Sequence, residues 1–146
     1  MKDFKISEHF TFFELTNTKD HPELLELNRE YFSVQPYIGR LTVASEYLLE
    51  TIRGDLNVPI YVLNGGRCPE LNSAVGGVLN SQHLYGNLND GAFDITTPAM
   101  TISELGQYIS DQSSLCWHQL RIYLKQNFIH IGMPRGSKDG QVTVIK

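Results

Sequence analysis

The stretch from Ser81 to Ile95, which reads SQHLYGNLNDGAFDI, concentrates residue types that can do chemistry. It holds His83, Asp90 and Asp94 in a segment with neither a clear helical nor a clear strand pattern. Imidazole nitrogens and carboxylate oxygens are the ligands that zinc and similar metals take from proteins. From these residues alone two interpretations stay open. The stretch is either an ordinary polar loop or a loop that carries the first two ligands of a metal site.

A later histidine, His130, lies in the segment FIHIG. Strand alternation places Phe128, His130 and Gly132 on one face of a strand, and the two isoleucines on the other. A polar ring beside a glycine leaves room for another group to approach. A lone histidine of this kind is more often structural, and the same holds for His118, which follows Trp117 at the start of the preceding strand.

The helices that must position these residues have clear signals. Apolar residues recur at helical spacing over residues 36–56, which predicts the longest amphipathic helix, ending near Gly54. Capping boxes at 11–14 and 101–104 predict two helix starts, the second helix running to about Ile109. A short helix with proline at its first position is expected from Cys68-Pro69-Glu70.

Strand patterns dominate the second half of the chain. A β-branched strand over 58–63 is closed by Asn64-Gly65-Gly66, and further strands are expected over 119–124, 128–133 and 142–145. The first two of these last three are separated by a hairpin-length turn. Helices followed by an antiparallel sheet predict an α+β fold. We expect one domain over residues 1–146, with N-terminal helices packed on a C-terminal antiparallel sheet.

Composition excludes several classes of function. A chain of 146 residues with 41% hydrophobic residues is long enough for one globular domain with a real core. Its net charge of −4 comes without a basic stripe, so we expect no nucleic-acid partner. No apolar run is long enough to span a bilayer, and no signal peptide is apparent, so we expect a protein that is cytoplasmic when made. Cys68 and Cys116 are too far apart for a CxxC metal knuckle, and we expect structural roles for both.

Several segments, in this order, resemble the peptidase M15 family: SEHFTFFELT, NGGRCPELNSAVGG, SQHLYG, GAFDI and FIHIG. These are zinc D-Ala-D-Ala carboxypeptidases and related phage or bacterial cell-wall endopeptidases. The resemblance spans roughly residues 7–132, and its central part is specific. It implies a compact α+β domain of the Hedgehog/DD-peptidase type, a Zn²⁺ cofactor, and peptidoglycan stem peptides as partners. A protein of this kind acts at the cell wall once it is released or carried there by a phage.

The resemblance also assigns roles to particular residues. His83 and His130 match the two histidine ligands of the metal. Arg67 matches the arginine that grips a peptide carboxylate or polarises the scissile carbonyl, a task that suits a planar and permanently charged guanidinium. The alternative for Arg67 is a surface ion pair. Ser81 and Gln82 are expected to support the loop.

The carboxylate ligand is where the sequence departs from the family spacing. That spacing, seven positions after the first histidine, leads to Asp90, yet the family context GxAxDI surrounds Asp94 as GAFDI, eleven positions on. Removing four residues, for example 88–91, restores the family pattern. We therefore predict an insertion of turn-forming residues and take Asp94 as the third ligand, with Asp90 as the alternative.

A second departure concerns the general base. The family places a carboxylate on the hairpin before the last histidine, but residues 118–127 contain none. The alignment puts Tyr123 near that position and His118 at a neighbouring family aspartate. A tyrosine with an ordinary pKa near 10 is a poor base at neutral pH, although its hydroxyl can donate to an oxyanion. His118 can serve as the base if it faces the metal.

These residues leave two main hypotheses. The first is a zinc metallopeptidase that cuts peptidoglycan stem peptides with an atypical or missing general base. The second is a catalytically inactive M15-like module that binds the cell wall or has a structural role, for example in a phage particle. A third, a fold without a metal, follows if the insertion has displaced the aspartate.

Overall fold

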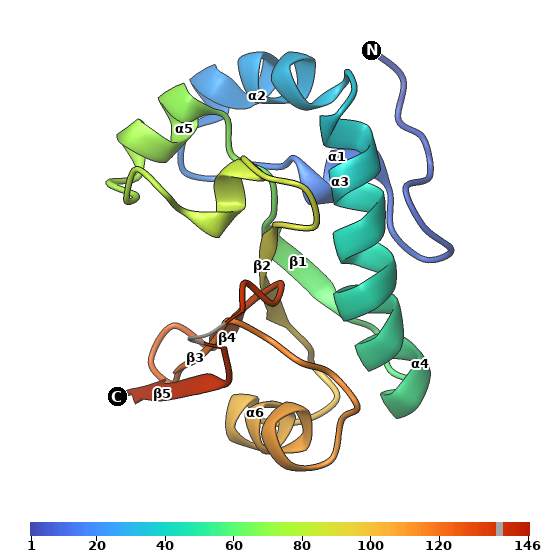
Figure 1. Ribbon diagram of the computed structural model, residues 1–146, viewed down its shortest axis with the longest axis vertical. Coiled ribbons are helices and arrows are strands. Elements are labelled where there is room, and N and C mark those ends of the chain that lie inside the picture. Colours follow the sequence, from blue (N-terminus) through green and yellow to red (C-terminus); the bar gives the residue numbers. More distant parts are fainter. Residues whose placement is uncertain (137–138) are drawn as a thin grey trace.

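The central sheet is assembled from strands that lie far apart in the sequence (Figure 1). The computed structural model describes residues 1–136 and 139–146. Five strands pair in the order β1-β2-β4-β3-β5. Their bounds are β1 Tyr61–Asn64, β2 Ala92–Thr96, β3 Gln119–Tyr123, β4 Phe128–Gly132 and β5 Gln141–Ile145. The expected strands are present, although the first is shifted toward Asn64.

The sheet is mixed rather than wholly antiparallel. β1, β2, β4 and β3 pair antiparallel to their neighbours, but β5 runs parallel to β3. The reason is the connection after β4. It returns the chain to the beginning of β3, where the Gly140 amide donates to the Trp117 carbonyl, so β5 starts beside the start of β3 and follows its direction.

Helices precede most of the sheet, as predicted, and the fold class is α+β. The α-helices are α1 Phe12–Leu15, α2 Leu25–Phe32, α3 Tyr37–Ala44, α4 Thr51–Leu56, α5 Pro69–Ala74 and α6 Ile102–Asp111. Two short 3₁₀ turns are η1 Pro22–Leu24 and η3 Gln82–Leu84, and η2 Ser45–Glu50 is a π-helical segment. The segments α3, η2 and α4 follow one another without a break and form the long helix expected over 36–56 (Figure 1). It ends at Asn57, whose φ of 51° is left-handed.

Both predicted capping boxes are formed. The Glu14 amide donates to the Thr11 hydroxyl, and the Glu14 carboxylate accepts from the Thr11 amide. Thr101 and Glu104 make the same reciprocal pair at the start of α6. These bonds satisfy amides that a helix start otherwise leaves without partners.

The two faces of the sheet have different neighbours. Buried apolar residues of β2, β3 and β4 face a core that includes the long helix and α6. On the opposite face, four polar residues of adjacent strands form one row, in the order Asn64, Asp94, His130 and Arg121. The alternation predicted for β4, with His130 facing away from the two buried isoleucines, is confirmed.

The loop after β1 joins the N-terminal helices to this polar face. The Gly66 amide donates to the Leu15 carbonyl, and a Cβ on Gly65 would overlap that same oxygen. Asn28 on α2 is fully buried; its amide group donates to the Gly66 carbonyl, and its oxygen accepts from the Cys68 amide. The loop is therefore held tightly on the side away from the sheet.

No helix in the described residues is both long and apolar enough to cross a membrane. Cys68 and Cys116 are both free thiols, the first buried and the second exposed.

We predict that Gly66→Ala destabilises the protein, because the added Cβ would lie 2.7 Å from Cζ of the Phe32 ring. Overpacking of this kind costs about 1–3 kcal/mol. Gly54→Ala in α4 is the matched control, since a Cβ there meets no atom within 4 Å. It should stabilise the helix by about 0.5–1 kcal/mol. Urea unfolding measures both, and equal free energies of unfolding for the two variants would contradict the packing described.

Candidate metal centre

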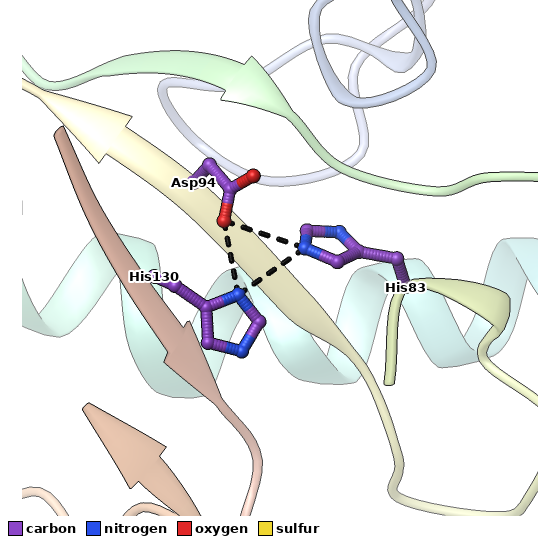
Figure 2. A group of neighbouring side chains, drawn as sticks. All are labelled: His83, Asp94 and His130. Atoms are coloured by element: carbon purple, nitrogen blue, oxygen red, sulfur yellow. Dashed lines mark hydrogen bonds and ion pairs between the residues drawn. The ribbon is translucent and has the colours of Figure 1, made fainter. Parts of the chain in front are cut away.

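Three side chains from separate elements converge on the polar face of the sheet (Figure 2). His83 Nε2 lies 3.3 Å from Asp94 Oδ1, and His130 Nδ1 lies 2.9 Å from the same oxygen. The two imidazole nitrogens are 3.2 Å apart. The side chains of His83 and Asp94 are only 3% and 10% exposed, whereas His130 is 15% exposed. The group is therefore buried, with its most open side at His130.

The spacing and chemistry of these atoms fit a cation. Ligands about 2.0–2.2 Å from a tetrahedral zinc ion lie about 3.3–3.6 Å from one another. The three distances here, 2.9–3.3 Å, are close to that range. Two imidazoles and one carboxylate form a set of three protein ligands that leaves a fourth position open, as catalytic sites require. The structure thus brings together the three residues proposed as ligands from the sequence.

Asp94 is positioned by strand register and by a bulge in its neighbour. It lies opposite His130 in the β2–β4 pairing. On its other side the β1–β2 register shifts between Val62 and Asn64, so that Asn64 rather than Leu63 pairs with Asp94. The Asn64 amide then donates to Asp94 Oδ2 over 3.2 Å, which leaves Oδ1 turned toward the histidines. Bulges commonly re-aim side chains beside functional sites in this way.

His83 is held in one tautomer by the loop after β1. It lies in η3, where Ser81 caps the turn by accepting from the His83 amide. Its Nδ1 donates to the Gly65 carbonyl over 2.7 Å. With the proton fixed on Nδ1, a neutral His83 presents the free electron pair of Nε2 to the other two side chains.

The surroundings of the site favour an ionised Asp94 and a neutral His130. Burial opposes ionisation of Asp94, but attraction to His83 and hydrogen bonding with His130 outweigh it and lower the pKa of Asp94. Burial also lowers the pKa of His130, against the opposing effect of Asp94. Ionised carboxylates and neutral imidazoles are the forms that bind metals.

Asp90, the alternative ligand, faces a different set of partners. Its carboxylate pairs with Arg135, with Nη2 at 2.8 Å and Nε at 3.2 Å. Gln82 donates to Asp90 and to the Met133 carbonyl, both over 2.8 Å. A Cβ on Gly132 would overlap the Gln82 amide, so the space beside His130 is filled by this glutamine. Asp90 and Gln82 therefore tie the loop to β4 without joining the histidines.

Arg67 lies in the same cleft as the three side chains. The cleft has a volume of about 420 Å³ and is also lined by His118, Arg121 and Tyr123. The Arg67 amide donates to the His83 carbonyl over 2.7 Å, and its Nη2 donates to the Ser81 hydroxyl over 3.2 Å. Its buried Nε has no hydrogen-bond partner in the part of the chain that the structure describes. Burial lowers the pKa of Arg67, and Asp94 partly offsets that effect.

His118 and Tyr123 both line the cleft, with different supports. His118 Nδ1 donates to Asp139 Oδ1 over 3.0 Å. Asp139 is fixed in turn by the amides of Arg135 and Gly136. Tyr123 stacks on Phe128, with ring centroids 4.4 Å apart and planes 15° apart.

Three supporting residues were missed by reasoning from the sequence. Asn28 has no local signal, because its partners Thr16, Gly66 and Cys68 lie 12, 38 and 40 residues away. Asn64 was interpreted only as a turn former at the end of a strand. Its side-chain amide can donate to a carboxylate on a neighbouring strand, and this property was a usable signal. Asp139 comes after β4, and nothing in the sequence links it to His118.

A second group of potential ligands consists of Glu8, His9 and Glu50. His9 Nδ1 lies 2.7 Å from Glu50 Oε2, and the His9 amide and the Ser7 hydroxyl both donate to Glu50 Oε1. These contacts occupy His9 Nδ1 and both oxygens of the Glu50 carboxylate, and they tie the N-terminal segment to η2.

The fold is α+β, and two histidines, an aspartate and an arginine share one cleft, a set of groups that can bind a metal ion and an anionic ligand. A family profile for Peptidase M15 matches residues 14–132, so the chain belongs to the peptidase M15 family. The resemblance found in the sequence is thereby confirmed. Members are usually metallopeptidases, so membership indicates a peptidase. Searches of curated proteins and of solved structures each gave no match.

We predict that Asp94→Asn strongly lowers the affinity for Zn²⁺, because it removes the charged ligand. The loss should exceed the roughly 10–100-fold that is typical when a residue supporting a ligand is lost. Asp90→Asn is the matched control. It should keep the Zn²⁺ affinity but lower the melting temperature, because it weakens the pair with Arg135. Competition with a chromogenic chelator measures affinity. Loss of Zn²⁺ in Asp90→Asn with retention in Asp94→Asn would overturn the ligand assignment.

Proposed function

We propose that this protein is a zinc-dependent peptidase, a carboxypeptidase or endopeptidase, that acts on peptidoglycan stem peptides. The observation that supports this most strongly is the convergence of His83, Asp94 and His130 within 3.3 Å of one another in a cleft of an M15 family member. Zinc suits this donor set, since it takes nitrogen and oxygen ligands and favours a four-coordinate arrangement. When bound, it supplies a Lewis acid that polarises the scissile carbonyl.

Arg67 orients the substrate. Its guanidinium is partly desolvated, and its unpartnered Nε is a donor that a substrate carboxylate satisfies. Arg67 lines the same cleft as the three proposed ligands, and this supports the role. A peptide held there by its carboxylate brings a neighbouring carbonyl toward the group of three.

His118 serves as the general base. Asp139 fixes its Nδ1 proton, so a neutral His118 carries its free electron pair on Nε2, in a residue that lines the cleft. The Tyr123 hydroxyl is the candidate donor to the oxyanion that forms at the carbonyl. Apart from Asp94, no carboxylate belongs to a described residue that lines the cleft. The usual carboxylate base is therefore replaced or missing.

That missing carboxylate also favours the second candidate, an M15-like module that binds the cell wall or has a structural role, such as one in a phage particle. The peptidase and the inactive module would share the three proposed metal ligands and Arg67, but only the peptidase would turn over substrate. Hydrolysis of purified stem peptides by zinc-loaded protein, with chelator-treated protein as the control, distinguishes them. We expect slow, zinc-dependent cleavage; absence of cleavage under all zinc conditions favours the module.

We predict that His118→Ala lowers kcat by about 10²–10⁴-fold, the usual contribution of a general base. Tyr123→Glu returns a carboxylate to the position where the family has one but removes the oxyanion donor, so it should raise kcat only if the wild type lacks a working base. Asp139→Asn, which keeps the size of the side chain, should give an intermediate loss. Fast turnover in the wild type that neither His118→Ala nor Tyr123→Glu changes would show that the hairpin has been misaligned.

For Arg67 we predict that replacement by alanine raises KM by about tenfold or more while the fold is kept, since a charge-assisted hydrogen bond is lost. Arg67→Lys keeps the positive charge but lacks the planar guanidinium, so its KM should lie between those of the wild type and Arg67→Ala. A peptide whose terminal carboxylate is amidated should bind all three proteins alike. A collapse of the melting temperature in Arg67→Ala would instead assign Arg67 to the structure.

A further inference from the structure

The cleft contains more positive charge than its own carboxylates neutralise. Three arginines line it, Arg67, Arg121 and Arg135. Arg135 is paired with Asp90, and Asp94, the carboxylate of the cleft, is held by two histidines. A bound divalent cation would add further positive charge. The cleft is therefore suited to an anionic ligand, although the chain as a whole carries a net charge of −4.

Arg121 is the arginine with no assigned role. It lies on β3 directly opposite His130, on the face away from Leu120 and Ile122, which pack against α6. Side chains opposite each other in an antiparallel pair have Cβ atoms about 4.5–5.5 Å apart. No hydrogen bond or ion pair links its guanidinium to another residue in the described ranges 1–136 and 139–146.

Arg121 lies at the β3 end of the polar row, and Arg67 follows β1, the strand at the other end of that row. In the row across the sheet, Asn64 and Asp94 come first and His130 and Arg121 follow. Arg67 comes shortly after Asn64 in the sequence, whereas Arg121 pairs with His130 in the β3–β4 register, and both arginines line the cleft. Two strand spacings, about 10 Å, separate Asp94 from Arg121 along the row. That separation corresponds to about three residues of extended peptide.

We propose that Arg121 is a specificity-determining residue that binds an acidic side chain of the substrate, across the metal ligands from the carboxylate that Arg67 binds. The preferred substrate is thus a peptide with anionic groups on both sides of the scissile bond. This inference rests on the proposed function for its geometry. A carboxylate suits Arg121 because a guanidinium binds it through two parallel hydrogen bonds.

Binding to the metal-free protein tests the inference without relying on catalysis. The probes are two stem peptides of one sequence, one with a free side-chain carboxylate and one with that group amidated; both keep the terminal carboxylate. Isothermal titration calorimetry of chelator-treated wild type should show about tenfold or more tighter binding of the acidic peptide, because only that peptide makes charge-assisted hydrogen bonds with Arg121. Arg121→Gln should bind both peptides equally, and Arg121→Lys should retain part of the preference.

Lys125→Gln is the matched control, because it removes one positive charge from the exposed turn of the same hairpin outside the cleft. It should keep the full preference. Equal binding of the two peptides by the wild type, no measurable binding of either, or an unchanged preference in Arg121→Gln would each overturn the proposal. Measuring zinc-dependent hydrolysis of both peptides distinguishes failure of this proposal from failure of the proposed peptidase function. Cleavage without preference removes only the role of Arg121, and preference without cleavage removes only the peptidase.

Discussion

The close packing of the loop after β1 against the N-terminal helices is the constraint on which the rest of the structure depends. Gly65 and Gly66 approach α1 and α2 so closely that a side chain on either would overlap Leu15 or Phe32. This approach brings the Gly65 carbonyl to His83 Nδ1 and the Arg67 amide to the His83 carbonyl. One tight loop therefore sets the tautomer of a candidate ligand and places the arginine beside it.

Features with local causes could be predicted from the sequence. Both capping boxes depend on residues three positions apart, and the outward orientation of His130 follows from strand alternation alone. The choice of Asp94 over Asp90 was also accessible, because the family context GxAxDI surrounds it, although strand β2 itself had no clear pattern in the sequence. In each case the chemistry of a few adjacent residues decides the outcome.

Features that depend on distant partners could not be predicted in the same way. The parallel pairing of β5 is set by the route of the chain after β4, and the bulge at Asn64 is visible only against β2. Helix α2 lacks a strong cap, and its buried Asn28 derives its role from contacts with the β1 loop. The pairing of His118 with Asp139 joins a strand start to a later loop. Such contacts follow from tertiary packing, which the periodicity of a single segment does not contain.

The central claim is that His83, Asp94 and His130 bind one zinc ion together. X-ray absorption spectroscopy at the zinc edge of protein loaded with one equivalent of Zn²⁺ tests this most directly. We expect nitrogen and oxygen atoms at about 2.0–2.2 Å from the zinc ion, with more distant scattering from two imidazole rings. His83→Ala should reduce that more distant scattering to one ring. A sulfur shell at about 2.3 Å, or a shell of oxygen atoms without imidazole scattering, would contradict it.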